Sequence, residues 1–204
     1  MDDLIFKAKK HEYVTEDGKK LPSVSDIISC LSYFCYGEID KFILEQAAQR
    51  GSKIHELTQF LDEVGITECP YELSGYVQAY AKFLNEHEHR WVLTEEPMRY
   101  MDDYAGTIDR FGIVDDVKVL LDIKTNSKLS GKQLTLYETQ LNLYRRMLEN
   151  HDYPVERMYI LHLKRDGEYK LIDVEKTDEL ANMCLFIWKK MHERKRRKSN
   201  GRTD

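Results

Sequence analysis

Residues 105–125 read Ala-Gly-Thr-Ile-Asp-Arg-Phe-Gly-Ile-Val-Asp-Asp-Val-Lys-Val-Leu-Leu-Asp-Ile-Lys-Thr, and this segment is the most informative one in the chain. Two mostly apolar runs flank the dipeptide Asp115-Asp116, a pattern that predicts a β-hairpin. If this dipeptide is a two-residue turn, Asp109 lies directly opposite Asp122, with their Cβ atoms roughly 4.5–5.5 Å apart. Lys124 then lies on the same face as Asp122, because side chains alternate along a strand.

Two facing carboxylates destabilise a hairpin unless a cation offsets their charge. Lys124 can supply part of that charge, and a divalent ion held by oxygen ligands can supply the rest. The alternative is an Asp–Lys–Asp salt-bridge cluster on a solvated face. For the metal-free site of the first reading we expect one of the two aspartates to titrate above the ordinary value of about 3.9.

The rest of the chain predicts an α/β (α+β) fold, with a central mixed sheet flanked by helices and a helical N-terminal part. After a short strand at His11–Val14, helices are expected from Ser23, over Glu38–Gln49, around Ile54–Leu57 and over Leu73–His89. Further strands are expected at Trp91–Tyr100, Ala105–Val114 and Val117–Thr125. Helical periodicity covers Gln133–Asn150. A second hairpin, Val155–Lys164 with Glu168–Val174, and a helix over Asp178–Lys195 complete the chain.

We expect one domain over residues 1–204, since nothing in the sequence marks a linker. Its parts are a mainly helical segment (1–90), the sheet with its helix (91–176), and a final helix with a basic tail (177–204).

Composition excludes several classes of protein. The chain has 204 residues, 42% hydrophobic and 33% charged, with a net charge of −5, which is typical of a globular protein. The N-terminus lacks the apolar core of a signal peptide, and no apolar run is long enough to span a bilayer, so a cytoplasmic location without membrane contact is expected. The spacing of the four cysteines indicates neither a disulfide scaffold nor a metal cage.

Four motifs together resemble one known family. Gly106-Thr107-Ile108-Asp109, followed by Asp122-Ile123-Lys124, resembles the core signature of the PD-(D/E)XK nucleases. Residues 50–55 resemble the Arg-Gly-x-x-x-His element of their RecB-like branch, and Gln140 to Tyr144 resembles its Gln-x-x-x-Tyr motif. Residues 21–24 resemble an N-terminal element of its phage-type exonucleases. The motifs run in order from about residue 20 to 165.

This resemblance implies roles for particular residues. The metal ligands would be His55, Asp109, Asp122 and the backbone carbonyl of Ile123, and they would hold Mg²⁺ or Mn²⁺. Lys124 would act on the attacking water.

Further roles follow from the same resemblance. Gln140 and Tyr144 would reach the phosphate or the lysine, and Glu95 or Glu96 would supply an outer-shell acid. Lys128 and Lys132 would contact DNA phosphates, or they are ordinary solvated charges. The CRISPR-associated members of the same branch carry an iron–sulfur cluster on one cysteine before the helical histidine and three near the C-terminus. Only Cys184 lies near the C-terminus here, so we expect no iron–sulfur cluster.

The function implied is a metal-dependent DNA exonuclease acting at linear ends in phage-type recombination or repair, with a recombination protein as a further partner. The alternatives are a non-catalytic module that binds DNA ends or a partner, and an endonuclease. The basic run Lys189–Lys198 is either a phosphate-contacting arm or a solvated helix end. Oligomeric state, cleavage polarity and strand preference stay open.

Overall fold

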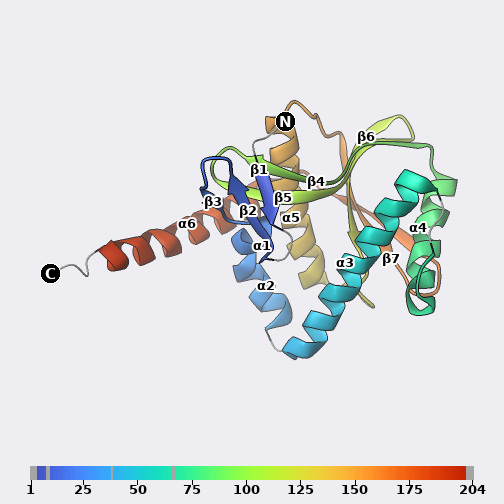
Figure 1. Ribbon diagram of the computed structural model, residues 1–204, viewed down its shortest axis with the longest axis horizontal. Helices are drawn as coiled ribbons and strands as arrows, with labels where there is room; N and C mark the ends of the chain where they lie inside the picture. The colour runs from blue at the N-terminus through green and yellow to red at the C-terminus, as the bar shows by residue number, and fades with distance from the viewer. Residues whose placement is uncertain (1–3, 8–9, 38, 66–67, 201–204) are drawn as a thin grey trace.

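The structure is a computed structural model, and it is built on a five-stranded sheet of order β4-β5-β6-β7-β8 (Figure 1). The structure describes residues 4–7, 10–37, 39–65 and 68–200, and for 194–200 the backbone alone. The strands of the sheet are β4 (His89–Tyr100), β5 (Tyr104–Val114), β6 (Val117–Lys124), β7 (Arg157–Leu163) and β8 (Tyr169–Val174).

The first hairpin has the predicted turn. Asp115 and Asp116 have φ angles of 47° and 64°, as a tight type I′ connection requires. The β5–β6 ladder runs from Val114–Val117 to Arg110–Leu121, in the predicted register. It ends there, so Asp109 and Asp122 are not a ladder pair, contrary to the expectation that they face each other directly.

The remaining strands complete a mixed sheet. The helix α5 (Gly131–Asn150) leads from β6 to β7, which pairs parallel to β6. A turn at Gly167, with φ of 86°, joins β7 to its antiparallel partner β8. α5 begins two residues before the predicted start because Ser130 and Gln133 form a capping box around its first turn.

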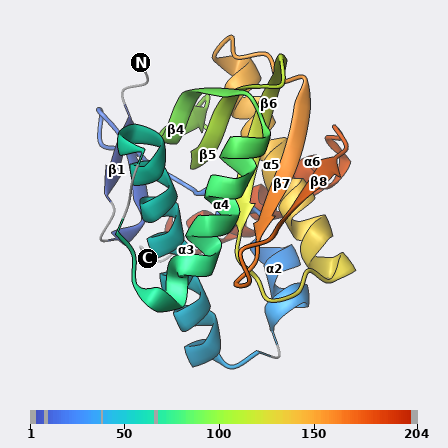
Figure 2. The same cartoon turned by 90° about the vertical axis from the view of Figure 1, so that its right-hand side faces the viewer.

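Helices cover both faces of the sheet, and each face has its own hydrophobic core (Figure 2). α3 and α4 pack on one face, against side chains such as Leu121 and Ile123. α1, α2, α5 and α6 pack on the other, where Leu120 and Ile160 are buried. The predicted fold class, a mixed sheet flanked by helices with a helical segment before it, is confirmed. The helices are α1 (Val24–Ile27), α2 (Ser29–Tyr36), α3 (Lys41–Val64), α4 (Ser74–Glu86) and α6 (Glu179–Asn200).

The N-terminal segment also holds a small antiparallel sheet. Its strands are β1 (Leu4–Lys7), β2 (Glu12–Thr15) and β3 (Lys20–Leu21). Only β2 was expected, and β3, with two residues, is too short to show a periodic pattern. The sheet packs through Tyr13 and Leu21 against Ala105 at the start of β5, which places it beside the Gly106–Asp109 motif.

The prediction of separate helices at residues 38–49 and around Ile54 was wrong. They form one helix, α3, which begins after the cap Asp40 and ends at Gly65; Glu38 lies outside the described residues. No proline interrupts the segment, and a single glycine inside a helix costs only about 1 kcal/mol. The continuity matters because α3 carries His55 to the sheet.

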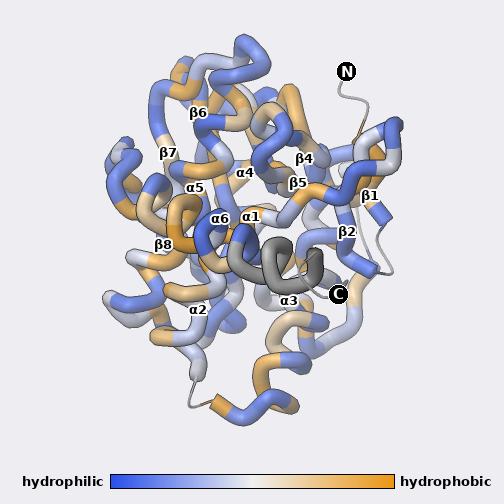
Figure 3. Tube along the Cα trace, turned by 90° about the vertical axis from the view of Figure 1, so that its left-hand side faces the viewer, coloured by the Kyte–Doolittle hydropathy of each residue, from blue (hydrophilic) through white to orange (hydrophobic). Residues whose placement is uncertain are grey.

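The last helix, α6, lies across α1 and α5, and its C-terminal half extends away from the body (Figures 1 and 3). Cys184 on α6 lies 3.8 Å from Cys30 on α2, sulfur to sulfur, a proximity that their sequence separation does not suggest. Among the described helices, none combines the length and the apolar character needed to cross a bilayer.

Candidate active site

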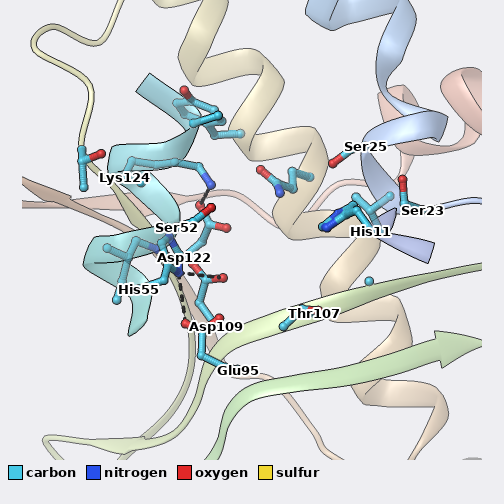
Figure 4. Close-up of a pocket in the computed structure, with 18 of the residues that line it drawn as sticks. His11, Ser23, Ser25, Ser52, His55, Glu95, Thr107, Asp109, Asp122 and Lys124 are labelled. Carbon is cyan, nitrogen blue, oxygen red and sulfur yellow. Dashed lines mark hydrogen bonds and ion pairs between the residues drawn. The ribbon is translucent and has the colours of Figure 1, made fainter. Parts of the chain in front are cut away.

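A cavity of about 920 Å³ opens between the small N-terminal sheet, α3, α5 and the β5–β6 hairpin (Figure 4). Seven of the residues singled out from the sequence line it, although they come from four different elements. They are His55, Asp109, Asp122, Ile123, Lys124, Gln140 and Tyr144. The fold therefore brings together the core of the predicted site.

The Asp109 carboxylate accepts a main-chain hydrogen bond from the neighbouring strand β6, as main-chain carbonyls do elsewhere in the ladder. Its Oδ2 accepts a hydrogen bond of 2.7 Å from the amide of Ile123. Ile108 and Phe111 both point into the core beneath α5, although they are three residues apart. Strict alternation would put them on opposite faces, so the alternation of side chains is interrupted between them, although the pairing with β4 keeps one register from Ile108 to Phe111. At this irregularity the Asp109 carboxylate lines the cavity.

His55 on α3 meets this carboxylate and a second one. Its Nδ1 lies 3.0 Å from Oε1 of Glu95 and 3.6 Å from Oδ1 of Asp109 (Figure 4). The choice between Glu95 and Glu96, which the sequence left open, falls on Glu95, because Glu96 is exposed to solvent and does not line the cavity.

Asp122 and Lys124 form a second group beside the first. The Lys124 Nζ lies 2.5 Å from Oδ2 of Asp122, whose side chain is 1% exposed. Oδ1 of Asp122 is buried without a hydrogen-bond partner among the described residues. The Lys124 ammonium also lies 4.8 Å from the ring centre of Tyr137, which gives the cation a second favourable contact.

Proton affinities in this cluster are strongly perturbed. Burial raises the pKa of Asp109 to about 7, aided by the charges of Asp122 and Glu95 and opposed by His55. Burial alone would lower the pKa of His55, yet Asp109 and Glu95 outweigh it and raise that pKa to about 9. Likewise, burial of Lys124 is outweighed by Asp122 and Asp109, so its pKa stays above the ordinary value. The expectation that one aspartate titrates high agrees with the direction found for Asp109.

Gln140 and Tyr144 share one face of α5, and the Gln140 amide donates a hydrogen bond of 2.9 Å to the Tyr144 hydroxyl. Tyr144 packs closely over Gly106, where an added Cβ would lie only 2.7 Å from its Cε1. The glycine of the signature is therefore needed for this close approach.

Lys128 and Lys132 are exposed and do not line the cavity. Their predicted contact with DNA stays a prediction. The basic run after residue 193 falls where side chains are not described, so the proposed phosphate-contacting arm stays a prediction as well.

Sequence reasoning missed Arg110, which is 0% exposed and bonded to Glu95. A signal was present, since a lone basic residue inside an apolar strand is rarely buried without acidic partners. Tyr137 was expected only as a residue of the helix over Gln133–Asn150, on the apolar stripe that gives this helix its periodicity.

The donor set fits a divalent cation. Ligand atoms of His55, Glu95 and Asp109 all lie within 4.8 Å of one another. The unpartnered oxygen of Asp122 adds a further acceptor in the same cavity. Two or three carboxylates with one imidazole suit Mn²⁺, and the carboxylates suit Mg²⁺. The sequence indicated Glu95 only as one of two candidates for an outer-shell acid, whereas its carboxylate lies with His55 and Asp109 in the metal-binding group. Asp122, which was predicted as a ligand, forms an ion pair with Lys124.

No family model matches the chain, and a search of curated proteins finds no match. Several solved structures are similar, among them the following two. One is an alkaline exonuclease from Laribacter hongkongensis, with 16% identity and a TM-score of 0.42, covering 87% of this chain and 90% of that one. The other is SSO0001, with 14% identity and a TM-score of 0.41, covering 83% and 75%. Both likenesses are too distant to transfer a function.

Proposed function

We propose that the protein is a metal-dependent DNA exonuclease that hydrolyses phosphodiester bonds at the ends of linear DNA. The observation that carries the proposal is the pairing, in one cavity, of a metal-binding group with a buried lysine. His55, Glu95 and Asp109 supply the metal-binding group, and Lys124 lies beside Asp122 at its edge. The order of the sequence motifs supports the finer assignment to the phage-type branch, and with it a role in recombination or repair.

Each side chain has a task in this proposal. His55, Glu95 and Asp109 would hold Mg²⁺ or Mn²⁺, with Asp122 as a further ligand. The bound ion would lower the pKa of a water molecule and offset the charge that the phosphate gains in the transition state.

The other groups act on the substrate directly. Lys124 is held protonated by Asp122, so it donates hydrogen bonds to the attacking water and stabilises negative charge as it develops. The Gln140 amide, fixed by the Tyr144 hydroxyl, is placed to donate to a phosphate oxygen in the same cavity.

The test compares linear with covalently closed circular DNA, each incubated with Mg²⁺, Mn²⁺ or excess chelator. An exonuclease degrades the linear DNA, leaves the circle intact and stops in chelator. Cleavage of the circle indicates an endonuclease instead. Binding to linear ends without any cleavage indicates a non-catalytic module.

Lys124→Ala, purified in the same way, is the matched control. Its activity should be lower by about 10²–10³-fold, and equal activity in both preparations would reveal a contaminating nuclease or a wrong role for Lys124.

A further inference from the structure

Arg110 lies fully buried beneath the candidate site, and its guanidinium spans two groups of partners. At one end, Nε donates a hydrogen bond of 2.7 Å to Oδ2 of Asp62 on α3. At the other end, Nη1 donates a hydrogen bond of 2.9 Å to Oε1 of Glu95 on β4. Nη2 donates to the hydroxyl of Thr58, one turn after His55. One side chain thus joins the helix of His55 to the strand of Glu95.

The Asp62 end of this network is structural. The Asp62 carboxylate also accepts hydrogen bonds from the Tyr80 hydroxyl at 2.8 Å and from the Trp91 indole at 3.2 Å. Its side chain is only 6% exposed. Neither Asp62 nor Trp91 lines the cavity, so this end can be altered without touching the candidate metal ligands.

The Glu95 end reaches the site. Glu95 has a φ of 48° within its strand, a conformation that is uncommon for residues other than glycine and persists only where the surroundings hold it. Oε1 of Glu95 receives both Arg110 Nη1 and His55 Nδ1. No described residue is hydrogen-bonded to the other oxygen, Oε2.

We infer that Arg110 is a positioning residue, which holds Oε1 of Glu95 so that Oε2 is presented to the metal. This inference rests on the proposed metal site and names the residue that orients its carboxylate. Arg110 itself is buried away from substrate and acts through Glu95. Partners of this kind typically change metal affinity by about 10- to 100-fold when they are replaced.

The measurement is the affinity of the metal-free protein for Mn²⁺, read from the paramagnetic resonance signal of free Mn²⁺ at a temperature well below unfolding. Binding to the unaltered protein is measured first. Its absence would overturn the metal site, and with it both the proposed function and this inference. If it binds, Arg110→Lys should weaken binding about 10- to 100-fold, because one ammonium cannot reach Asp62 and Glu95 together.

Two comparisons separate positioning from stability. Trp91→Phe removes a bond at the structural end and should lower thermal stability without changing Mn²⁺ affinity. In a double-mutant cycle, Arg110→Lys should cost little more once Glu95→Gln is present, since both act through one carboxylate. Unchanged affinity in Arg110→Lys, or fully additive losses in the cycle, would overturn the inference.

A second variant covers the case in which Arg110→Lys does not fold. The double substitution Arg110→Met with Asp62→Leu replaces the buried ion pair by apolar groups, a change that proteins often tolerate. It should fold and show the same loss of Mn²⁺ affinity. Full affinity in this folded variant would show that Arg110 is purely structural.

Discussion

The two aspartates of the hairpin should respond in opposite ways to removal of their charge. Asp109 has a pKa raised to about 7, so in the metal-free protein its ionised form is disfavoured by folding. A pKa about three units above the ordinary value corresponds to at most about 4 kcal/mol at pH 8. Asp109→Asn removes this charge and keeps an oxygen that can accept from the Ile123 amide.

For Asp109→Asn we expect the free energy of unfolding to rise by roughly 1–3 kcal/mol at pH 8. The gain is smaller than the full cost of the buried charge, because the substitution also removes the attraction between Asp109 and His55. For a chain of this size the unfolding midpoint should rise by about 3–10 °C. The raised pKa also gives the sign of the pH dependence: the cost of ionising Asp109 accumulates as pH rises from about 3.9 to 7. The gain should therefore shrink by about half at pH 5.5.

Asp122→Asn should have the opposite effect. Lys124 lies 2.5 Å from this carboxylate and is only 15% exposed, so the change leaves a buried ammonium without its partner. Removing one member of such a pair costs about 3 kcal/mol. The assay is thermal unfolding of both variants in excess chelator at pH 8 and pH 5.5. Equal losses in both variants would refute the reasoning and favour a simple Asp–Lys–Asp salt-bridge cluster.

Three further changes follow from the same geometry. Lys124→Ala should lower kcat by about 10²–10³-fold while Mn²⁺ binding is kept, as single-turnover kinetics and a metal titration would show; a near-normal kcat would exclude its role. The raised pKa of His55 contributes up to about 3 kcal/mol of metal-free stability, which is fully present below pH 6.5 and lost as pH rises through about 9. His55→Ala should flatten that part of the stability profile and weaken Mn²⁺ binding, whereas an unchanged profile would contradict the assignment. Gly106→Ala should cost about 1–3 kcal/mol, because its Cβ would lie 2.7 Å from Tyr144; an undisturbed unfolding midpoint in denaturant would show that the contact relaxes freely.

The features that depend on neighbours in the chain could be predicted from the amino-acid sequence. The Asp115-Asp116 turn and the alternation of apolar residues were sufficient for the register of β5 and β6. The helix start at Ser23 was predicted from the Ser-x-x-Asp spacing, and Ser23 and Asp26 form a capping box there. These features are local, because a turn type, a cap or a periodic stripe is decided within a few residues.

The assembly of the site, in contrast, depends on contacts between distant parts of the chain. Asp109 lines the cavity at the point where its carboxylate accepts a hydrogen bond from the Ile123 amide. The choice of Glu95 over Glu96 depends on His55, forty residues earlier, and Arg110 is explained only by partners on α3, α4 and β4. Such contacts join distant parts of the chain, and burial there makes each charge depend on its partners. No local pattern records that dependence, so the hairpin could be predicted from sequence and its electrostatic setting could not.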